Sequence, residues 1–245
     1  MITIENISKA FGKVKVLDQL TLELFRGQSV ALIGPNGSGK TTLIKCLLGL
    51  AIPDSGIIKI DGNDVKGEWQ YRSRIGYMPQ IGRYPDNITV MQLLQMIKEI
   101  RKGTYDVLDE ELLESFHVKS FGNKTMRTLS GGTRQKVSAC LAFMFDPEIL
   151  ILDEPTAGLD PVSAEILKEK VKTEQRKGKL VLITSHILSD LEDLTNEVAF
   201  INEGRLIFFK QVEAIKKETG SGNLSKAIAR IMQEQNLITP IDNIL

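Results

Sequence analysis

The sequence contains only two cysteines and two histidines in 245 residues. Cys46 and Cys140 lie far apart in apolar, helix-like runs, which favours buried free thiols in a reducing compartment over a disulfide. The chain has no Cys or His cluster with the spacing of a metal site. We therefore expect neither cysteine to have a redox or metal-binding role.

An excess of one charge is also missing, because 31 Lys and Arg balance 31 Asp and Glu. This balance gives no indication of a nucleic-acid surface, and we expect no nucleic-acid partner. No apolar run approaches the roughly 18 residues that a membrane-spanning helix needs, and residues 1–6 lack the pattern of a secretory signal. We expect a cytoplasmic chain, so that any membrane partner is a separate polypeptide.

The most specific motif is a glycine-rich loop that matches the phosphate-binding pattern G-x-x-x-x-G-K-[ST] at every fixed position. Its glycines let backbone N–H groups approach an anion, its lysine adds a positive charge, and the hydroxyl of its threonine can bind Mg²⁺. A short apolar strand precedes the loop and a helix follows it, which is the order that the motif requires. The residues predicted to hold a nucleoside triphosphate here are Gly34, Pro35, Asn36, Gly37, Ser38, Gly39, Lys40, Thr41 and Thr42.

Two adjacent carboxylates follow a second apolar strand, predicted at 148–152. Open α/β sheets bind ligands at the carboxyl ends of their strands, so Asp153 is placed to hold Mg²⁺ and Glu154 to polarise an attacking water. Without the phosphate loop, a solvated strand end would be the better interpretation of this pair. The two motifs together favour phosphoryl transfer.

A second glycine-rich element begins at Leu129. Ser130 is a good helix N-cap, and Gly131 and Gly132 expose backbone N–H groups at the start of a helix, so this element is a second candidate anion site. Two such sites in one chain make sense if the second completes the nucleotide site of another copy.

The remaining pattern predicts an α/β fold. Alternating apolar residues at 2–7, 20–24 and 57–60 indicate an antiparallel flank beside a parallel core sheet, to which the run at 180–184 belongs. Apolar residues at helical spacing predict a helical insertion at about 85–145. A terminal hairpin at 198–209 precedes a helical tail.

Over about residues 1–210 the chain resembles the ATPases of ATP-binding cassette (ABC) transporters, in the order and spacing of six motifs. These are Gly34 to Thr41, Gln80, Leu129 to Gly132, Asp153-Glu154, Ala157 to Asp160, and His186. The resemblance implies a P-loop NTPase of the ABC ATPase fold, with a mixed core sheet, an antiparallel β subdomain and a helical insertion. It divides the chain into an ABC ATPase domain at 1–210 and a short helical tail at 211–245, with ATP and Mg²⁺ as cofactors.

The resemblance also assigns roles by position. Phe11 and Val16 would contact the nucleotide, with Phe11 stacked on adenine, although Phe11 could also be an ordinary core aromatic. Gln80 would reach both the Mg²⁺ that Thr41 and Asp153 hold and the attacking water. His186 would contact the γ-phosphate, so that Glu154, His186 and Gln80 form the catalytic set.

Asp160 would lie at a dimer interface, and it also fits the N-cap of a helix that begins at Pro161. One position departs from the family pattern, because Thr133 stands where glutamine is most common. Since Ser130 and both glycines are intact and Gln135 lies close by, we expect only a minor change in the composite site.

The resemblance implies a homodimer that sandwiches ATP and drives integral membrane permease subunits, held on the inner face of the cell membrane. The general pattern is similar to exporter ATPases. More narrowly, Gly76 to Pro85 with Leu129 to Lys136 resembles the ABC-2-type ATPase of the nitrous-oxide-reductase copper-maturation transporter. Nothing in these residues identifies a substrate.

Two other classes are open at this point. One is an ABC ATPase without a membrane partner, such as a cluster-assembly scaffold; long coiled coils and a second cassette, which mark other non-transport relatives, are missing here. The other is an inactive binding module, which the presence of Lys40, Asp153, Glu154 and His186 disfavours.

Overall fold

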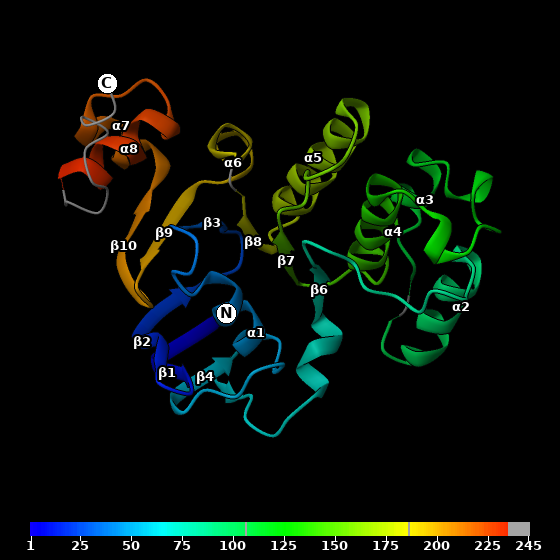
Figure 1. The fold of residues 1–245 in the computed structure, drawn as a ribbon, viewed down its shortest axis with the longest axis horizontal. Helices are drawn as coiled ribbons and strands as arrows, with labels where there is room; N and C mark the ends of the chain where they lie inside the picture. Colours follow the sequence, from blue (N-terminus) through cyan, green and yellow to red (C-terminus); the bar gives the residue numbers. More distant parts are fainter. Residues whose placement is uncertain (106, 186, 235–245) are drawn as a thin grey trace.

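The computed structural model describes residues 1–105, 107–185 and 187–234. The N-terminal part of the chain forms an antiparallel sheet. Its strands lie side by side in the order β2 (Val14–Leu24), β1 (Ile2–Phe11), β4 (Ser55–Ile60) and β5 (Asn63–Asp64). Figure 1 shows this sheet beside helix α1 (Lys40–Leu47), on the lower side of the view.

The second sheet has six strands in the order β10 (Arg205–Gln211), β9 (Glu197–Asn202), β3 (Ser29–Ile33), β8 (Leu180–Thr184), β7 (Ile149–Asp153) and β6 (Ile75–Met78). All neighbours are parallel except β10, which pairs antiparallel with β9. Strands β3, β7 and β8 are buried at every position, as continuous apolar runs in a parallel sheet require.

The six-stranded sheet separates two hydrophobic cores. Side chains alternate between the faces of a strand, so Val30 and Leu32 join α1 and the antiparallel sheet on one side. Ala31 and Ile33 face the other core, which contains the remaining helices. Helix α1 is therefore held between the sheets, with the loop before it fixed at the carboxyl edge of β3.

Most of the helices lie between β6 and β7 or after β7. The first group is α2 (Val90–Ile100), α3 (Glu111–Ser115), the 3₁₀ turns η2 (Val118–Ser120) and η3 (Met126–Thr128), and α4 (Gly131–Phe143), gathered at one end in Figure 1. Gly76 lets α4 approach β6 closely, because a Cβ there would lie 2.1 Å from the carbonyl oxygen of Ala142. The other helical elements are η1 (Gln70–Arg74), α5 (Pro161–Arg176), α6 (Leu188–Leu194), α7 (Val212–Thr219) and α8 (Leu224–Glu234).

The structure confirms the predicted fold class of a mixed core sheet with an antiparallel flank and intervening helices. Cys46 and Cys140 are buried and free, as expected. Within the described ranges, every helix is too short or too polar to cross a bilayer. The division into a domain at 1–210 and a tail at 211–245 stays a prediction, and residues 235–245 of that tail lie outside the described residues.

Candidate functional site

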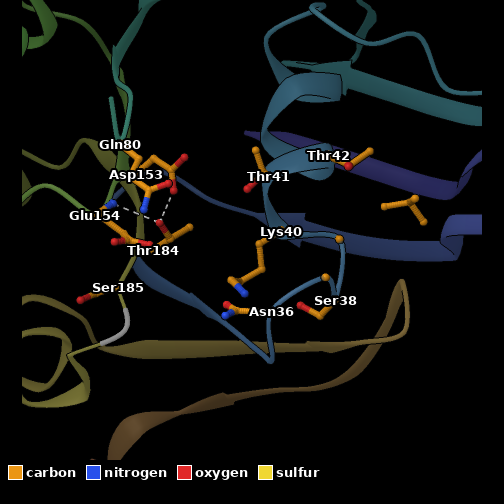
Figure 2. Close-up of a pocket in the computed structure, with 13 residues that line it drawn as sticks. Asn36, Ser38, Lys40, Thr41, Thr42, Gln80, Asp153, Glu154, Thr184 and Ser185 are labelled. Atoms are coloured by element: carbon orange, nitrogen blue, oxygen red, sulfur yellow. Dashed lines mark hydrogen bonds between the residues drawn. The ribbon is translucent and has the colours of Figure 1, made fainter. Parts of the chain in front are cut away.

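A cavity of about 350 Å³ opens at the carboxyl edge of the six-stranded sheet. Figure 2 shows that Lys40 and Thr41 lie on one side of it, whereas Gln80, Asp153 and Glu154 lie on the other. The lining residues are Val16, Asn36, Gly37, Ser38, Gly39, Lys40, Thr41, Thr42, Gln80, Asp153, Glu154, Thr184 and Ser185. The fold thus brings together the phosphate-binding motif and the paired carboxylates, which are more than a hundred positions apart in the sequence.

The loop before α1 has a backbone that only glycine fits at two of its positions. Gly34 has φ 153° and Gly39 has φ 108°. A Cβ at Gly34 would lie 2.0 Å from the carbonyl oxygen of Ile201, and one at Gly39 would lie 2.7 Å from that of Val16. The loop is therefore seated against β9 and β2, and its residues 36–39 line the cavity.

Ser38 provides an independent indication of a ligand. The residue is only 3% exposed, and its Oγ has no hydrogen-bond partner among the described residues. A buried hydroxyl without a partner is costly. Because Ser38 lines the cavity, a phosphate oxygen bound there would satisfy this hydroxyl.

Lys40 is folded back over the same loop. Its Nζ donates to the carbonyl oxygens of Gly34, at 2.8 Å, and Pro35, at 3.0 Å. Burial lowers the pKa of the Lys40 ammonium, and the carboxylates of Asp153 and Glu154 oppose that effect. These carbonyl contacts hold the Lys40 ammonium next to the N-terminus of α1. The helix dipole favours an anion at the same place, so both features attract negative charge to the cavity.

A threonine that the sequence interpretation missed fixes both carboxylates. Thr184 lies beside Asp153 in the register of β8 and β7, and its Oγ1 donates to Asp153 Oδ1 at 2.5 Å. The same hydroxyl accepts a hydrogen bond from the backbone N–H of Glu154 at 3.1 Å. Glu154 takes a left-handed conformation with φ 51°, directly after the strand ends. The sequence signal for Thr184 was a polar residue at the end of an apolar strand. Which residue it contacts depends on which strands are neighbours in the sheet, and the sequence does not give that.

The oxygen atoms around the cavity suit Mg²⁺ held together with phosphate. Thr41 and Asp153 supply hydroxyl and carboxylate oxygens, and the exposed Gln80, just after β6, adds an amide. In the part of the chain that the structure describes, no group of three or more His, Cys, Asp or Glu side chains could hold a metal by itself. This donor set fits Mg²⁺, which usually binds through one or two carboxylates plus substrate phosphates.

The serine-glycine element lies outside this cavity. Ser130 caps α4, as predicted, because its Oγ accepts the backbone N–H of Thr133 at 3.2 Å. Gly131 and Gly132 line a second hollow of about 520 Å³, and among the described residues Gln80 alone lines both this hollow and the first cavity. One copy of the chain therefore presents the two predicted anion sites separately.

The structure places some of the other predicted site residues at the cavity and others away from it. Val16 lines the cavity, whereas Phe11 does not and is 53% exposed, so the core-aromatic alternative for Phe11 is wrong. Asp160 is the N-cap of α5, as predicted, with Oδ1 accepting the N–H of Ser163 at 2.9 Å. A hydrogen bond from Lys136, followed by those from Ser163, lowers the pKa of the Asp160 carboxyl. His186 lies outside the described residues.

The residues that carry these motifs also match known proteins. Residues 17–157 match the family profile described as ABC transporter. The chain belongs to the ABC transporter family. The predicted class of ABC ATPase is thereby confirmed, and the chain is an ATP-binding subunit of this family.

Curated ABC relatives extend the similarity beyond the profile. Nod factor export ATP-binding protein I of Cupriavidus metallidurans is 35% identical over 90% of this chain and 74% of its own length. The Nod factor export ATP-binding protein I of Ralstonia nicotianae is 33% identical, and this chain spans 66% of its length. Daunorubicin resistance ATP-binding protein DrrA3 of Streptomyces coeruleorubidus is 34% identical over 91% of this chain and 72% of that protein.

Solved ABC structures share the fold. The ATP-binding subunit of an ABC transporter aligns with a TM-score of 0.85 and 27% identity, over 95% of this chain and 99% of that one. A dimeric cassette in a post-hydrolysis state, bound to ADP and phosphate, aligns with a TM-score of 0.77 and 22% identity, over 86% and 98% of the two chains. At 22% identity, the similarity to the dimeric cassette shows only that the two chains share a fold.

Proposed function

We propose that this chain is the ATP-hydrolysing subunit of an ABC-2-type exporter, and that two copies close around two ATP molecules to drive integral membrane subunits. The observation that carries the proposal is the cavity itself, where a glycine-rich loop faces a carboxylate pair. The hydroxyl of Ser38, which has no hydrogen-bond partner in the described part of the chain, supports an anion at the same place.

The phosphate loop binds the triphosphate in this proposal. Backbone N–H groups of residues 36–41 and the dipole of α1 receive the phosphates, and Lys40 exchanges its carbonyl contacts for phosphate oxygens. Bound Mg²⁺ neutralises phosphate charge, and the residues placed to hold it are Thr41, Gln80 and Asp153. Thr184 keeps the Asp153 carboxylate turned toward this position.

Glu154 is the group that orients and polarises the attacking water. The water oxygen bonds to the γ-phosphorus as the bond to the ADP oxygen breaks, and Glu154 accepts the water proton. The backbone N–H of Glu154 donates to both oxygens of Thr184, at 3.1 Å each, which fixes the place of this carboxylate. The assignment of His186 to the γ-phosphate rests on sequence.

The second copy supplies the opposite wall of each nucleotide site. Gly131 and Gly132 lie on a hollow outside their own cavity, and the exposed Ser130 precedes them, so these residues are available to another copy's γ-phosphate. Asp160 would lie at the same interface, and Phe11 would stack on the adenine. Loss of the γ-phosphate removes the bridging charge and lets the copies separate.

Export is favoured over other roles by the names of the relatives. Two are named for Nod factor export and one for daunorubicin resistance. A permease would then hold the chain on the inner face of the membrane. The finer assignment to copper maturation rests on the resemblance of Gly76 to Pro85 and Leu129 to Lys136. A cluster-assembly ATPase is the alternative.

Two measurements test the proposal. Purified chain should hydrolyse ATP with Mg²⁺; Lys40→Met should abolish ATP binding, and Glu154→Gln should retain binding while lowering kcat about 100-fold or more. Lys45→Met, at an exposed position on the same helix, should match the wild type. Glu154→Gln hydrolysing at the wild-type rate would contradict the assignment. In native-host fractionation an exporter subunit sediments with membranes, whereas the cluster-assembly alternative stays in the supernatant.

A further inference from the structure

We propose that Asp190 is a positioning residue for ATP hydrolysis. Through Thr156, it fixes the segment at 154–160, which joins the nucleotide cavity to the hollow of the serine-glycine element. The inference rests on the proposed function for its catalytic consequence.

Both carboxylate oxygens of Asp190 are engaged. Oδ2 accepts the hydroxyl of Thr156 at 2.9 Å, and Oδ1 pairs with Lys168 Nζ at 2.9 Å. The side chains of Lys168 and Asp190 are only 13% and 19% exposed, so solvent screens this pair weakly. Lys168 balances the charge of Asp190, which holds the carboxylate in place to accept the threonine hydroxyl at a charge-assisted distance.

The segment that Thr156 anchors has a contact with each site. At its start, Glu154 lines the nucleotide cavity. Three and four residues later, Ala157 and Gly158 line the second hollow, where a Cβ on Gly132 would lie 2.5 Å from the carbonyl oxygen of Gly158.

Two turns make the segment compact. The N–H of Ala157 donates to Glu154 O at 3.1 Å, and that of Leu159 donates to Thr156 O at 3.2 Å. A displacement of Thr156 would therefore move both ends of the segment.

Asp190 lies on the segment that follows β8 and the cavity-lining Ser185. It lies on α6, and its N–H donates to Ile187 O at 3.1 Å, two residues after the cavity-lining Ser185. The Asp190–Thr156 bond thus connects the segments that follow β7 and β8, in addition to the bonds of Thr184 with Asp153 and Glu154 at the strand ends. It links the segment after the cavity-lining Ser185 to the surface that would face the partner copy in the proposed dimer.

Asp190→Ala and Thr156→Val each remove this bond in the full-length chain, and Thr156→Ser keeps it. Glu165→Ala is the matched control, because Glu165 is the other carboxylate on Lys168, at 3.3 Å, and is 67% exposed. We expect kcat for ATP to fall about 10-fold in Asp190→Ala and Thr156→Val, with the Kd for a non-hydrolysable ATP analogue changed less than about twofold. The kcat of Thr156→Ser and of Glu165→Ala should stay near the wild-type value. The double variant that combines Asp190→Ala with Thr156→Val should lose no more kcat than the more impaired of the two single variants.

Hydrogen exchange separates this inference from the proposed function. The amides of Ala157 and Leu159 should exchange faster in Asp190→Ala and Thr156→Val than in Glu165→Ala, whether or not the chain hydrolyses ATP. Equal exchange in all three variants, or losses in kcat that multiply in the double variant, would overturn the inference. A wild-type chain without Mg²⁺-dependent hydrolysis would instead contradict the proposed function, and the exchange result would still decide the role of Asp190.

Discussion

Thr184 and Asp153 are in-register neighbours on parallel strands, and the threonine hydroxyl donates a 2.5 Å hydrogen bond to the Asp153 carboxylate. The same hydroxyl accepts the N–H of Glu154. One side chain, 3% exposed, therefore fixes the proposed metal ligand and the residue that follows it. The position of both carboxylates depends on the pairing of β7 with β8.

Thr184→Val should weaken Mg²⁺ binding, because the carboxylate loses the hydrogen bond that orients it. We expect the Mg²⁺ concentration for half-maximal ATP hydrolysis to rise about 10-fold, with Thr184→Ser close to the wild type. The measurement is a Mg²⁺ titration of the ATPase rate at saturating ATP. A Thr184→Val titration identical to that of the wild type would mean that Asp153 binds Mg²⁺ without the hydrogen bond from Thr184.

Gly131 and Gly132 should respond differently to alanine. A Cβ at Gly132 would lie 2.5 Å from Gly158 O, whereas one at Gly131 would meet no atom of the described residues within 4 Å. Gly132→Ala should lower the free energy of unfolding by about 1–3 kcal/mol, as overpacking does, and Gly131→Ala should not lower it. Chemical denaturation monitored by circular dichroism measures both. Equal stability losses would contradict the close approach of α4 to the segment after β7.

Sequence patterns predicted the parts of the site that are local. The phosphate loop, the caps Ser130 and Asp160, and the apolar strands β3, β7 and β8 each depend on a few neighbouring residues. Thr184 was missed because its role depends on which strands are neighbours. The short edge strand β6 was not anticipated because Gly76 interrupts its apolar run.

Interactions between distant segments were beyond any local pattern. Lys170 is 2% exposed and pairs with Asp109 at 2.5 Å and Glu111 at 2.6 Å, about sixty positions earlier. It also pairs with Glu174, one turn along α5, at 3.1 Å. A buried lysine is not predictable from sequence, since only the folded chain brings its carboxylates together.

Glu174 should make the protein sensitive to acid. Burial by itself raises the pKa of the Glu174 carboxyl, but hydrogen bonds from Lys177, Lys179 and Lys170 lower it to about 2. Because the folded-state pKa lies below the ordinary value of 4.5, the stabilisation is complete above that value and is lost as pH falls through about 2. The contribution is of the order of 3 kcal/mol.

Unfolding free energies from pH 7 down to pH 2 test this prediction. Glu174→Gln should be less stable at pH 7 and should lose less stability on acidification than the wild type, because the amide does not titrate. Parallel pH profiles for the two proteins would show that other groups control the acid transition.

Both thiols should be unreactive in the native protein. Cys46 and Cys140 are each 2% exposed, and burial raises the pKa of both, to about 11 for Cys46. Since the thiolate is the reactive form, a thiol-specific reagent at pH 8 should modify neither cysteine until denaturant is added, and then both. Rapid native labelling, counted by mass spectrometry, would contradict the burial of these residues.

Two copies share each ATP in the proposed mechanism, and light scattering on Glu154→Gln after size-exclusion chromatography tests this sharing most directly. With ATP and Mg²⁺ the variant should elute as a dimer, because ATP binds but is not hydrolysed, and without ATP it should elute as a monomer. Adding Ser130→Ala and Gly131→Ala should return it to a monomer that still binds ATP. A Glu154→Gln protein that stays monomeric with ATP bound, or dimerises equally without ATP, would contradict the shared site.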